Sequence, residues 1–326
     1  MSAVAAVAAA TAPRGRRRST VLTVGLVLVG LVVVVALISF AWLPYSQYDT
    51  SGGRLTPPGA AHWLGTDTLG RDLATQLLVG ARIALATGIG SVLVGGLAGV
   101  VIGLAAAFAW PWLDDTLSAI LDIVIAFPTL LVAMLLVAAR GASLGTAILA
   151  IGIAMSAIVA RLVRILARRV LRQDFVTAAR TSGTGWAGII VQHVLPNIWP
   201  TLAVNLALQF GLAVLAEASL SYLGLGAPPP NASWGRMLQA AQETAFAAPA
   251  GVIAPGVALV LLVVGVNLIA DGLRDVADPT RPGGRRRGAR PGRPAAGAPG
   301  APDVRPASAP VAADVRPTSA PAGRDA

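Results

Sequence analysis

The chain has 326 residues, of which 55% are hydrophobic and 12% charged, and its net charge is +10. Soluble domains carry about 25% charged residues, so this composition excludes an ordinary water-soluble enzyme, which needs more polar surface to stay dissolved. Cys is absent and all 25 basic residues are Arg, which excludes disulfides, thiolate metal sites, a Schiff-base lysine and a P-loop lysine.

Long apolar runs follow one another along the chain. A bilayer core of about 30 Å needs about 20 helical residues. Six runs reach that length: Val21–Trp42, Ile83–Leu113, Thr116–Ala139, Gly141–Ala160, Thr201–Leu223 and Thr244–Ala270. The first is longer than the apolar core of a signal peptide and is expected to stay uncleaved. We therefore predict an all-α polytopic membrane protein with six transmembrane helices.

The arginines indicate the orientation. With the N-terminus in the cytoplasm, the inside segments carry 20 of the 25 arginines, and the ratio is still ten to five without the C-terminal tail. Inside segments of membrane proteins are enriched in Arg. Both termini are therefore expected in the cytoplasm, and the basic ends without interleaved aromatic residues give no sign of nucleic-acid binding.

The chain divides into three parts by composition. Residues 1–19 form a basic cytoplasmic N-terminus, and residues 20–278 form the membrane domain. Residues 279–326 hold ten prolines, and their DVRPASAP sequence at Asp303–Pro310 recurs as DVRPTSAP at Asp314–Pro321. Such a segment has too few large apolar residues to form a core, so a disordered cytoplasmic tail is expected.

Three glycines lie four residues apart in the second apolar run. Gly95, Gly99 and Gly103 form a small-xxx-small pattern on one helix face. This pattern permits close helix packing. It suits either packing within the chain or a subunit interface, and we favour packing within the chain.

Catalytic and metal-binding patterns are missing. The two histidines, His62 and His193, fall on opposite sides of the membrane in this topology. Without Cys or a nucleophile–base motif, neither a conventional metal centre nor an enzyme is expected.

Two carboxylates lie within the apolar runs. Asp122 comes early in the third run and Glu217 late in the fifth. Intramembrane carboxylates are candidates for proton relay or substrate contact. Both lie within about two helical turns of a run's end, and the halves show no internal repeat, which counts against an ion-coupled secondary transporter.

The long inside loop, about 161–198, has a distinctive order. Arg161–Arg172 forms an amphipathic basic helix that continues the fourth span. Small residues at Ala178 and Ala179 permit close approach of another surface, and Gly183 permits a turn with positive φ. Leu195-Pro196 is expected to end the loop before a fifth helix that begins near residue 200. This order predicts a compact helical pair on the membrane face.

This loop resembles the E-A-A-x-x-x-G-x9-I-x-L-P loop of ABC importer permeases. Thr177-Ala178-Ala179 takes the E-A-A place, and Gly183 and Leu195-Pro196 take the later positions. Thr177 and His193 depart from the family's Glu and Ile. Two further blocks, HWLGTDTLGRD at His62–Asp72 and LAEASLSYLGLGAPPPNASWGRML at Leu215–Leu238, are similar to signatures of the dipeptide/oligopeptide/nickel branch, in its C-type subunit.

The resemblance spans about Thr20 to Val276 and implies a type I ABC importer permease-like fold in the bacterial cytoplasmic membrane. It implies half of a translocation pathway for di- or oligopeptides, with nickel chelates as the alternative cargo. The implied partners are a second homologous permease, two cytoplasmic ATPase subunits and an extracytoplasmic solute-binding protein. No cofactor is implied on this chain, because ATP binds to the partner subunits.

The resemblance also assigns residues to two sites. The ATPase-coupling loop comprises Asp174, Thr177, Ala178, Ala179, Arg180, Gly183, Leu195 and Pro196. Candidates for the outer gate or for binding-protein contact are Gly65, Asp67, Gly70, Arg71, Asp72, Gly224 and Trp234.

Overall fold

The computed structural model describes residues 20–228 and 231–277. The expected basic N-terminus and Pro-rich tail lie outside these residues. The described part is helical, and its one β-bridge joins Thr66 to Asp72. The expectation of an all-α membrane protein is confirmed, with five helices long and apolar enough to span a bilayer and a sixth span if one bent helix pair is counted.

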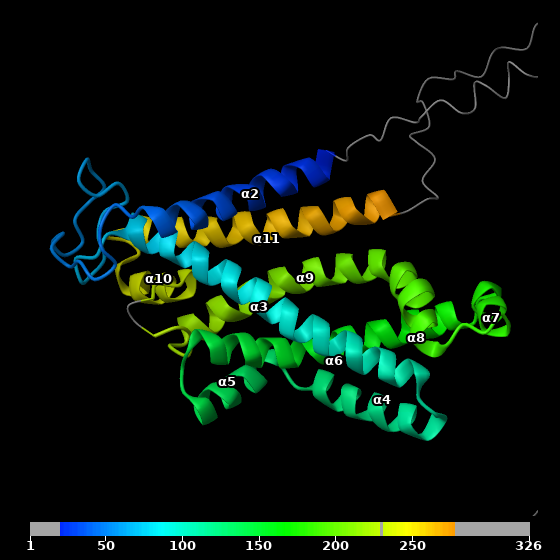
Figure 1. Ribbon diagram of the computed structural model, residues 1–326. Coiled ribbons are helices and arrows are strands. Elements are labelled where there is room, and N and C mark those ends of the chain that lie inside the picture. Colours follow the sequence, from blue (N-terminus) through cyan, green and yellow to red (C-terminus); the bar gives the residue numbers. More distant parts are fainter. Residues whose placement is uncertain (1–19, 229–230, 278–326) are drawn as a thin grey trace, which may run out of the picture. The chain divides into compact units, whose positions relative to one another are not determined.

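The elements of the first half are α2 (Thr20–Ala41), α3 (Leu73–Phe108), α4 (Pro111–Ala126), α5 (Thr129–Arg140) and α6 (Leu144–Leu171). Those of the second half are α7 (Asp174–Thr181), α8 (Trp186–Gly188), the π-helical η1 (Ile189–Val194), α9 (Leu195–Tyr222), α10 (Trp234–Ala241), the 3₁₀ turn η2 (Gln242–Thr244) and α11 (Ala250–Ala277). Figure 1 shows the loop before α3 at one end of the bundle and α7 at the other.

The third span is not the single helix expected over Thr116–Ala139. It consists of α4 and α5, which meet at an angle of 86° across Phe127 and Pro128. Proline has no N–H to donate and disfavours helical backbone in the residue before it. Phe127 accordingly adopts extended backbone with ψ 132°. The break follows from the proline, which a count of apolar residues does not register.

Other boundaries also differ from those expected. α3 begins at Leu73 rather than near Ile83, because Asp72 caps it by accepting a hydrogen bond from the Thr75 N–H at 2.7 Å. Arg82 is therefore inside this helix, where it hydrogen-bonds Ser39 of α2. α11 begins after Pro249 rather than at Thr244.

The expected helical continuation of the fourth span into the basic segment is confirmed. α6 runs without interruption for 28 residues from Leu144 to Leu171 and includes most of the basic segment. At a rise of 1.5 Å per residue its length is about 42 Å. It therefore exceeds the hydrocarbon thickness of a bilayer by two turns or more.

The three spaced glycines pack within the chain, as favoured from the sequence. A Cβ at Gly99 would lie 2.6 Å from Val159 Cβ, and one at Gly95 would lie 2.6 Å from the Gly152 carbonyl oxygen, both on α6. Gly103 faces Val163 of the same helix. The absence of side chains lets α3 and α6 approach closely, which is the usual basis of helix association in lipid.

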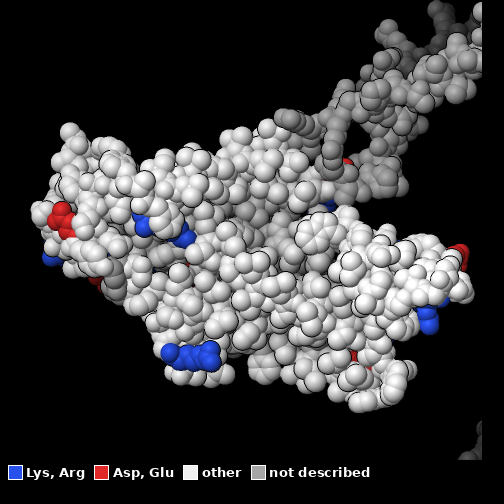
Figure 2. Space-filling model, in the orientation of Figure 1, with Lys and Arg blue, Asp and Glu red and all other residues white. Residues whose placement is uncertain are grey.

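α2 and α11 pack side by side in opposite directions (Figure 1). Gly25 of α2 faces the backbone of α11 at Gly265, and Gly272 of α11 faces Leu22 of α2. Thr20 and the last turns of α11 therefore lie at the same end of the bundle. On the face shown in Figure 2, charged side chains lie toward the two ends and the middle is uncharged.

Candidate functional site

The short helix α7 is attached to the bundle mainly by one apolar side chain. Val176 is 1% exposed and packs in a cluster with Ala167, Ile189 and Val194. The neighbouring Asp174, Thr177, Ala178 and Arg180 are exposed and Ala179 is half-buried. The structure therefore holds α7 by its inner face and presents the expected coupling residues outward.

Gly183 sets the turn after α7. Its φ of 89° lies in the left-handed region, which favours glycine. The N–H of Gly183 donates to the Arg180 carbonyl, and the N–H of Thr184 donates to the Ala179 carbonyl, each at 3.0 Å. This double closure is a Schellman motif, and it ends α7 sharply. The predicted turn at Gly183 is confirmed.

The expected end of the loop at Leu195-Pro196 is wrong. These residues lie in a continuous helical stretch from Trp186 to Tyr222, and no fifth helix starts separately near residue 200. Pro196 occupies the first turn of α9, where a missing N–H is tolerated. The π-helical turn Ile189–Val194 leads directly into it. The second part of the loop is therefore the start of a span.

Aromatic contacts tie the coupling loop to the span ends. The Arg180 guanidinium lies 4.2 Å above the Trp186 ring, and Trp186 meets Phe108, the last residue of α3, edge to face at 5.4 Å. The Phe175 and His193 rings lie 6.0 Å apart. Sequence reasoning missed Trp186 and Val176, whose only signal was a large apolar residue in a mostly polar loop.

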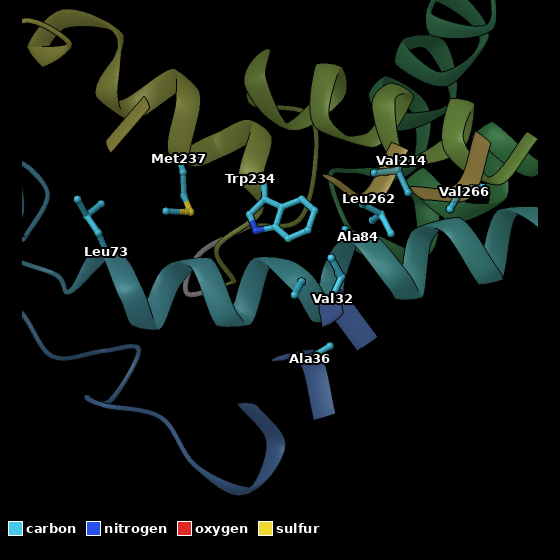
Figure 3. Packing of buried hydrophobic residues seen from close by; sticks show 10 residues of the cluster. Val32, Ala36, Leu73, Ala84, Val214, Trp234, Met237, Leu262 and Val266 are labelled. Atoms are coloured by element: carbon cyan, nitrogen blue, oxygen red, sulfur yellow. The ribbon is translucent and has the colours of Figure 1, made fainter. Parts of the chain in front are cut away.

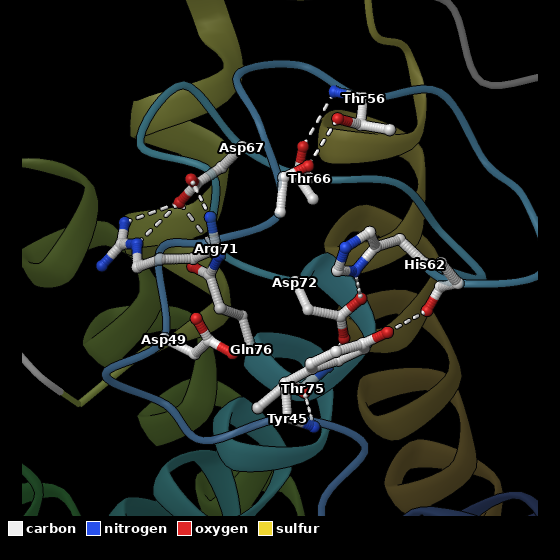
Figure 4. A network of polar contacts seen from close by, with 12 residues as sticks. Tyr45, Asp49, Thr56, His62, Thr66, Asp67, Arg71, Asp72, Thr75 and Gln76 are labelled. Carbon is white, nitrogen blue, oxygen red and sulfur yellow. Dashed lines mark hydrogen bonds and ion pairs between the residues drawn. The ribbon is translucent and has the colours of Figure 1, made fainter.

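The loop between α2 and α3, called the outer loop after its expected topology, folds around two carboxylates (Figure 4). Asp67 accepts hydrogen bonds from the backbone N–H groups of Leu69 and Arg71, the Arg71 Nε at 2.8 Å and the Gln76 amide at 3.0 Å. An ion pair with Arg71 adds a further contact at 2.7 Å. This one carboxylate therefore joins the loop to the first turn of α3.

Asp72 is the second carboxylate. It caps α3 and pairs with His62 Nδ1 at 3.0 Å, and the His62 ring packs against Tyr45 with centroids 4.6 Å apart. Gly65 and Gly70 have φ values of 81° and 80°. The structure thus brings the predicted residues of the HWLGTDTLGRD block together, with all of them buried except Arg71, which is half-buried.

Asp49, at the start of this loop, is half-buried and accepts a hydrogen bond from the Ser51 N–H at 2.9 Å. The hydrogen bonds from Ser51 lower the pKa of Asp49 below its usual value. Its carboxylate is therefore ionised at neutral pH and adds negative charge to this loop.

The other predicted outer residues, Gly224 and Trp234, lie on the segment from α9 to α10. Gly224, with φ 79°, closes α9 by a second Schellman turn. Trp234 is 3% exposed, and its Nε1–H donates to the Leu77 carbonyl of α3. Figure 3 shows its ring and Met237 directed from α10 toward α3.

The two intramembrane carboxylates have separate partners. Glu217 of α9 is 2% exposed and accepts a hydrogen bond from Ser221 at 2.6 Å, with a second interaction from Ser233. Asp122 of α4 is exposed and forms an ion pair with Arg161 of α6 at 3.2 Å. Each carboxylate is thus paired locally.

A family of known proteins accounts for this arrangement. The family described as binding-protein-dependent transport system inner membrane component matches residues 99–281, which include α4 to α11. The chain belongs to this family of permeases. The match includes the coupling loop, whereas the outer loop and α2 precede it.

Individual relatives extend the permease match toward the N-terminus. A dipeptide transport system permease of Alkalihalophilus pseudofirmus is 38% identical over 81% of this chain and 87% of its own length. A putative peptide transport system permease of Brucella suis is 40% identical over 81% and 88%. A glutathione transport system permease of Escherichia coli is 36% identical over 82% and 88%.

A solved structure, titled as an amino acid ABC transporter with histidines, aligns with the permease at a TM-score of 0.49 and 18% identity. It covers 61% of this chain and 94% of its own. The sequence matches establish the family, and they confirm an inner-membrane, multi-pass permease subunit.

Proposed function

We propose that this permease forms half of a pathway that imports small peptides. The support for the cargo is that relatives 36–40% identical over most of the chain are named for dipeptide, peptide and glutathione transport. Glutathione is itself a small peptide, so the named cargoes share one chemistry. Under this proposal a second homologous permease supplies the other half, and an extracytoplasmic binding protein delivers the peptide.

The exposed helix α7 carries the proposal for ATP coupling. It is short, held by Val176, and closed by a glycine turn, with Thr177, Ala178 and Arg180 facing outward. Such a projection suits docking into a groove of a separate ATPase subunit. ATP-driven movement of that subunit would then act on α7 and pass into α6, which is continuous from the cytoplasmic end to the far side. This is a two-state element biased by a partner.

Three observations support the proposed orientation. Contacts between α2 and α11 place Thr20 and the end of α11 at one end of the bundle, and Figure 1 shows α7 at that same end. The segment between the fourth and fifth spans, which includes α7, carries six arginines. Such an enrichment in Arg is typical of the cytoplasmic side. Both termini are therefore proposed to be cytoplasmic.

The outer signature residues are proposed to shape a docking surface rather than to touch the binding protein themselves. Asp67, Asp72 and Trp234 are buried, so their role is to hold the loop and α10 in place. The large apolar side chains exposed on the same loop are Tyr48, Trp63 and Leu69. We propose these three as the apolar residues available for contact with the binding protein.

Uptake in cells lacking this gene, with and without plasmid rescue, tests the function. Labelled dipeptide, glutathione, pentapeptide and radioactive nickel are supplied separately. A rescued loss of peptide uptake supports the proposal, whereas a rescued loss confined to nickel replaces the cargo. Depleting ATP at preserved membrane potential must stop the uptake, since continued uptake would indicate an ion-coupled carrier.

A further inference from the structure

Four arginines gather on one side of the cytoplasmic end of α6. Arg164, Arg168, Arg169 and Arg172, with Ile165 and Gln173, line an open pocket of about 500 Å³. Their spacing of four, one and three residues keeps them within one half of the helix circumference. We call this set of six residues the α6 arginine pocket.

An acidic residue on α4 orients part of this pocket. Arg164 donates to both carboxylate oxygens of Asp114, and Arg168 pairs with the same carboxylate at 2.8 Å. The side chain of Asp114 is only 4% exposed. A bidentate pair of this kind fixes a guanidinium in space. The inner edge of the pocket is therefore rigid.

The solvent-exposed part of the α6 arginine pocket has positive charge that no described carboxylate neutralises. Within the described residues, no ion pair joins Arg169 or Arg172 to a carboxylate, and both side chains are exposed. The pocket has four guanidiniums, and the carboxylates that act on them are Asp114, paired with Arg164 and Arg168, and Asp115, whose charge acts on Arg164. The excess is two positive charges. Arg161 adds none, because it is paired with Asp122.

Two observations place the pocket at the depth of lipid headgroups. A hydrocarbon core of about 30 Å spans about 20 residues, so a helix that begins at Leu144 leaves it near Arg164. Trp110 and Trp112, at the corner between α3 and α4, are 75% and 65% exposed. Tryptophan collects at the membrane–water interface, and Asp114 follows Trp112 by two residues.

We propose that the α6 arginine pocket binds the phosphate of an anionic phospholipid from the cytoplasmic leaflet. Guanidinium groups match phosphate oxygens in geometry and charge. Ile165, which is half exposed within the pocket, offers apolar surface beside that phosphate for the start of an acyl chain. A free phosphate ion has no apolar part that could pack against this surface.

The neighbouring surface also favours a lipid over a protein partner. Ile120 and Ile123 of α4, the helix that supplies Asp114, are exposed and follow Asp114 along α4 toward the middle of the membrane. An apolar flank below a basic pocket matches the two parts of a phospholipid, its tails and its headgroup. This inference is independent of the proposed cargo and of ATP coupling.

Native mass spectrometry of the detergent-purified full chain tests the proposal with dioleoylphosphatidylglycerol. The test variant is Arg169→Gln with Arg172→Gln, and the matched control is Arg54→Gln with Arg140→Gln, which removes two exposed arginines elsewhere. Loss of two charge-assisted contacts is expected to weaken lipid binding by at least about tenfold. The control is expected to bind like the unaltered chain, and Arg169→Lys with Arg172→Lys is expected to bind more tightly than the Gln pair.

Four results would overturn the proposal. They are unchanged phosphatidylglycerol binding by the Gln pair, an equal loss in the control, equal binding of dioleoylphosphatidylcholine, and displacement of the lipid by millimolar inorganic phosphate. Because both altered side chains are exposed, folding is expected to persist. An unchanged melting temperature of the Gln pair verifies this. If the melting temperature is lowered, the lipid-binding assay is repeated with each single substitution.

Discussion

The indole Nε1–H of Trp234 donates a hydrogen bond to the backbone carbonyl oxygen of Leu77 at 3.0 Å, although the two residues are 157 positions apart. The ring covers Gly80, where any Cβ would overlap it. Ser233 caps the same helix by accepting from the Arg236 N–H. One aromatic side chain therefore fixes the start of α10 against the outer part of α3.

Trp234→Ala is expected to destabilise the chain by about 3–5 kcal/mol, the usual cost of removing a large buried aromatic ring. Trp234→Phe keeps an aromatic ring but removes the indole hydrogen bond to the Leu77 carbonyl, at a smaller cost of about 0.5–1.5 kcal/mol. Thermal unfolding of the detergent-purified chain measures both. Trp199→Ala is the control, because Trp199 is exposed, and an equal loss there would contradict the assignment.

Gly99→Leu is expected to separate α3 from α6. The new Cβ would lie 2.6 Å from Val159 Cβ and 2.8 Å from the Ser156 carbonyl oxygen. Overpacking of this kind costs about 1–3 kcal/mol or more. Gly30→Leu is the matched control, because that helical glycine has no atom within 4 Å of its Cβ position. The comparison uses unfolding temperature, and similar values for the two variants would argue against tight packing at Gly99.

Gly183→Arg is expected to leave membrane insertion intact and to reduce peptide uptake per ATP hydrolysed. Its φ of 89° is strained for a residue with a side chain, so the turn after α7 shifts. Gly185→Arg is the control, since Gly185 has φ −69°. At both glycines no other atom lies within 4 Å of the position that a Cβ would take, so the two sites have equal space for a side chain. Uptake and ATPase activity are measured together in the assembled transporter. Normal peptide uptake by Gly183→Arg would contradict the coupling-loop proposal.

Asp67→Ala is expected to loosen the outer loop. It removes the acceptor of four hydrogen bonds and of the Arg71 ion pair. Bonds to charged groups are worth about 1.5–3 kcal/mol each, so the loop should open to protease from the outer side many times faster. Asp49→Ala, which alters a carboxylate of the same loop that accepts hydrogen bonds only from Ser51 among the described residues, serves as the comparison and is expected to change the cleavage rate little.

Glu217→Gln is expected to leave the apparent KM for peptide uptake unchanged. Glu217 is buried and engaged by Ser221, so a substrate amine has no route to it in this structure. The amide also keeps an oxygen that accepts from Ser221. Uptake measured over a range of dipeptide concentrations checks this, and a raised KM with unchanged protein level would instead indicate contact with the substrate.

Part of the conformation of the coupling loop could be predicted from the sequence. Gly183 was expected to turn, and its positive φ and double closure show why a glycine stands there. The end of the loop was not readable, because Leu195-Pro196 looks like a helix breaker and yet lies in the first turn of α9. Likewise, Pro128 lies in the third apolar run, but the length of the run was the only property used to predict this span. The 86° bend was therefore not predicted.

The sequence by itself determined the membrane class, the approximate spans and the family, because apolar length and short signatures are local properties of the chain. Only the tertiary structure decided which side chains meet. The buried position of Trp234, the packing of Gly99 on Val159 and the pairing of Asp114 with Arg164 and Arg168 each join distant segments. Such contacts depend on how whole helices pack against one another: the spaced glycines predicted close packing, but not which helix they would meet.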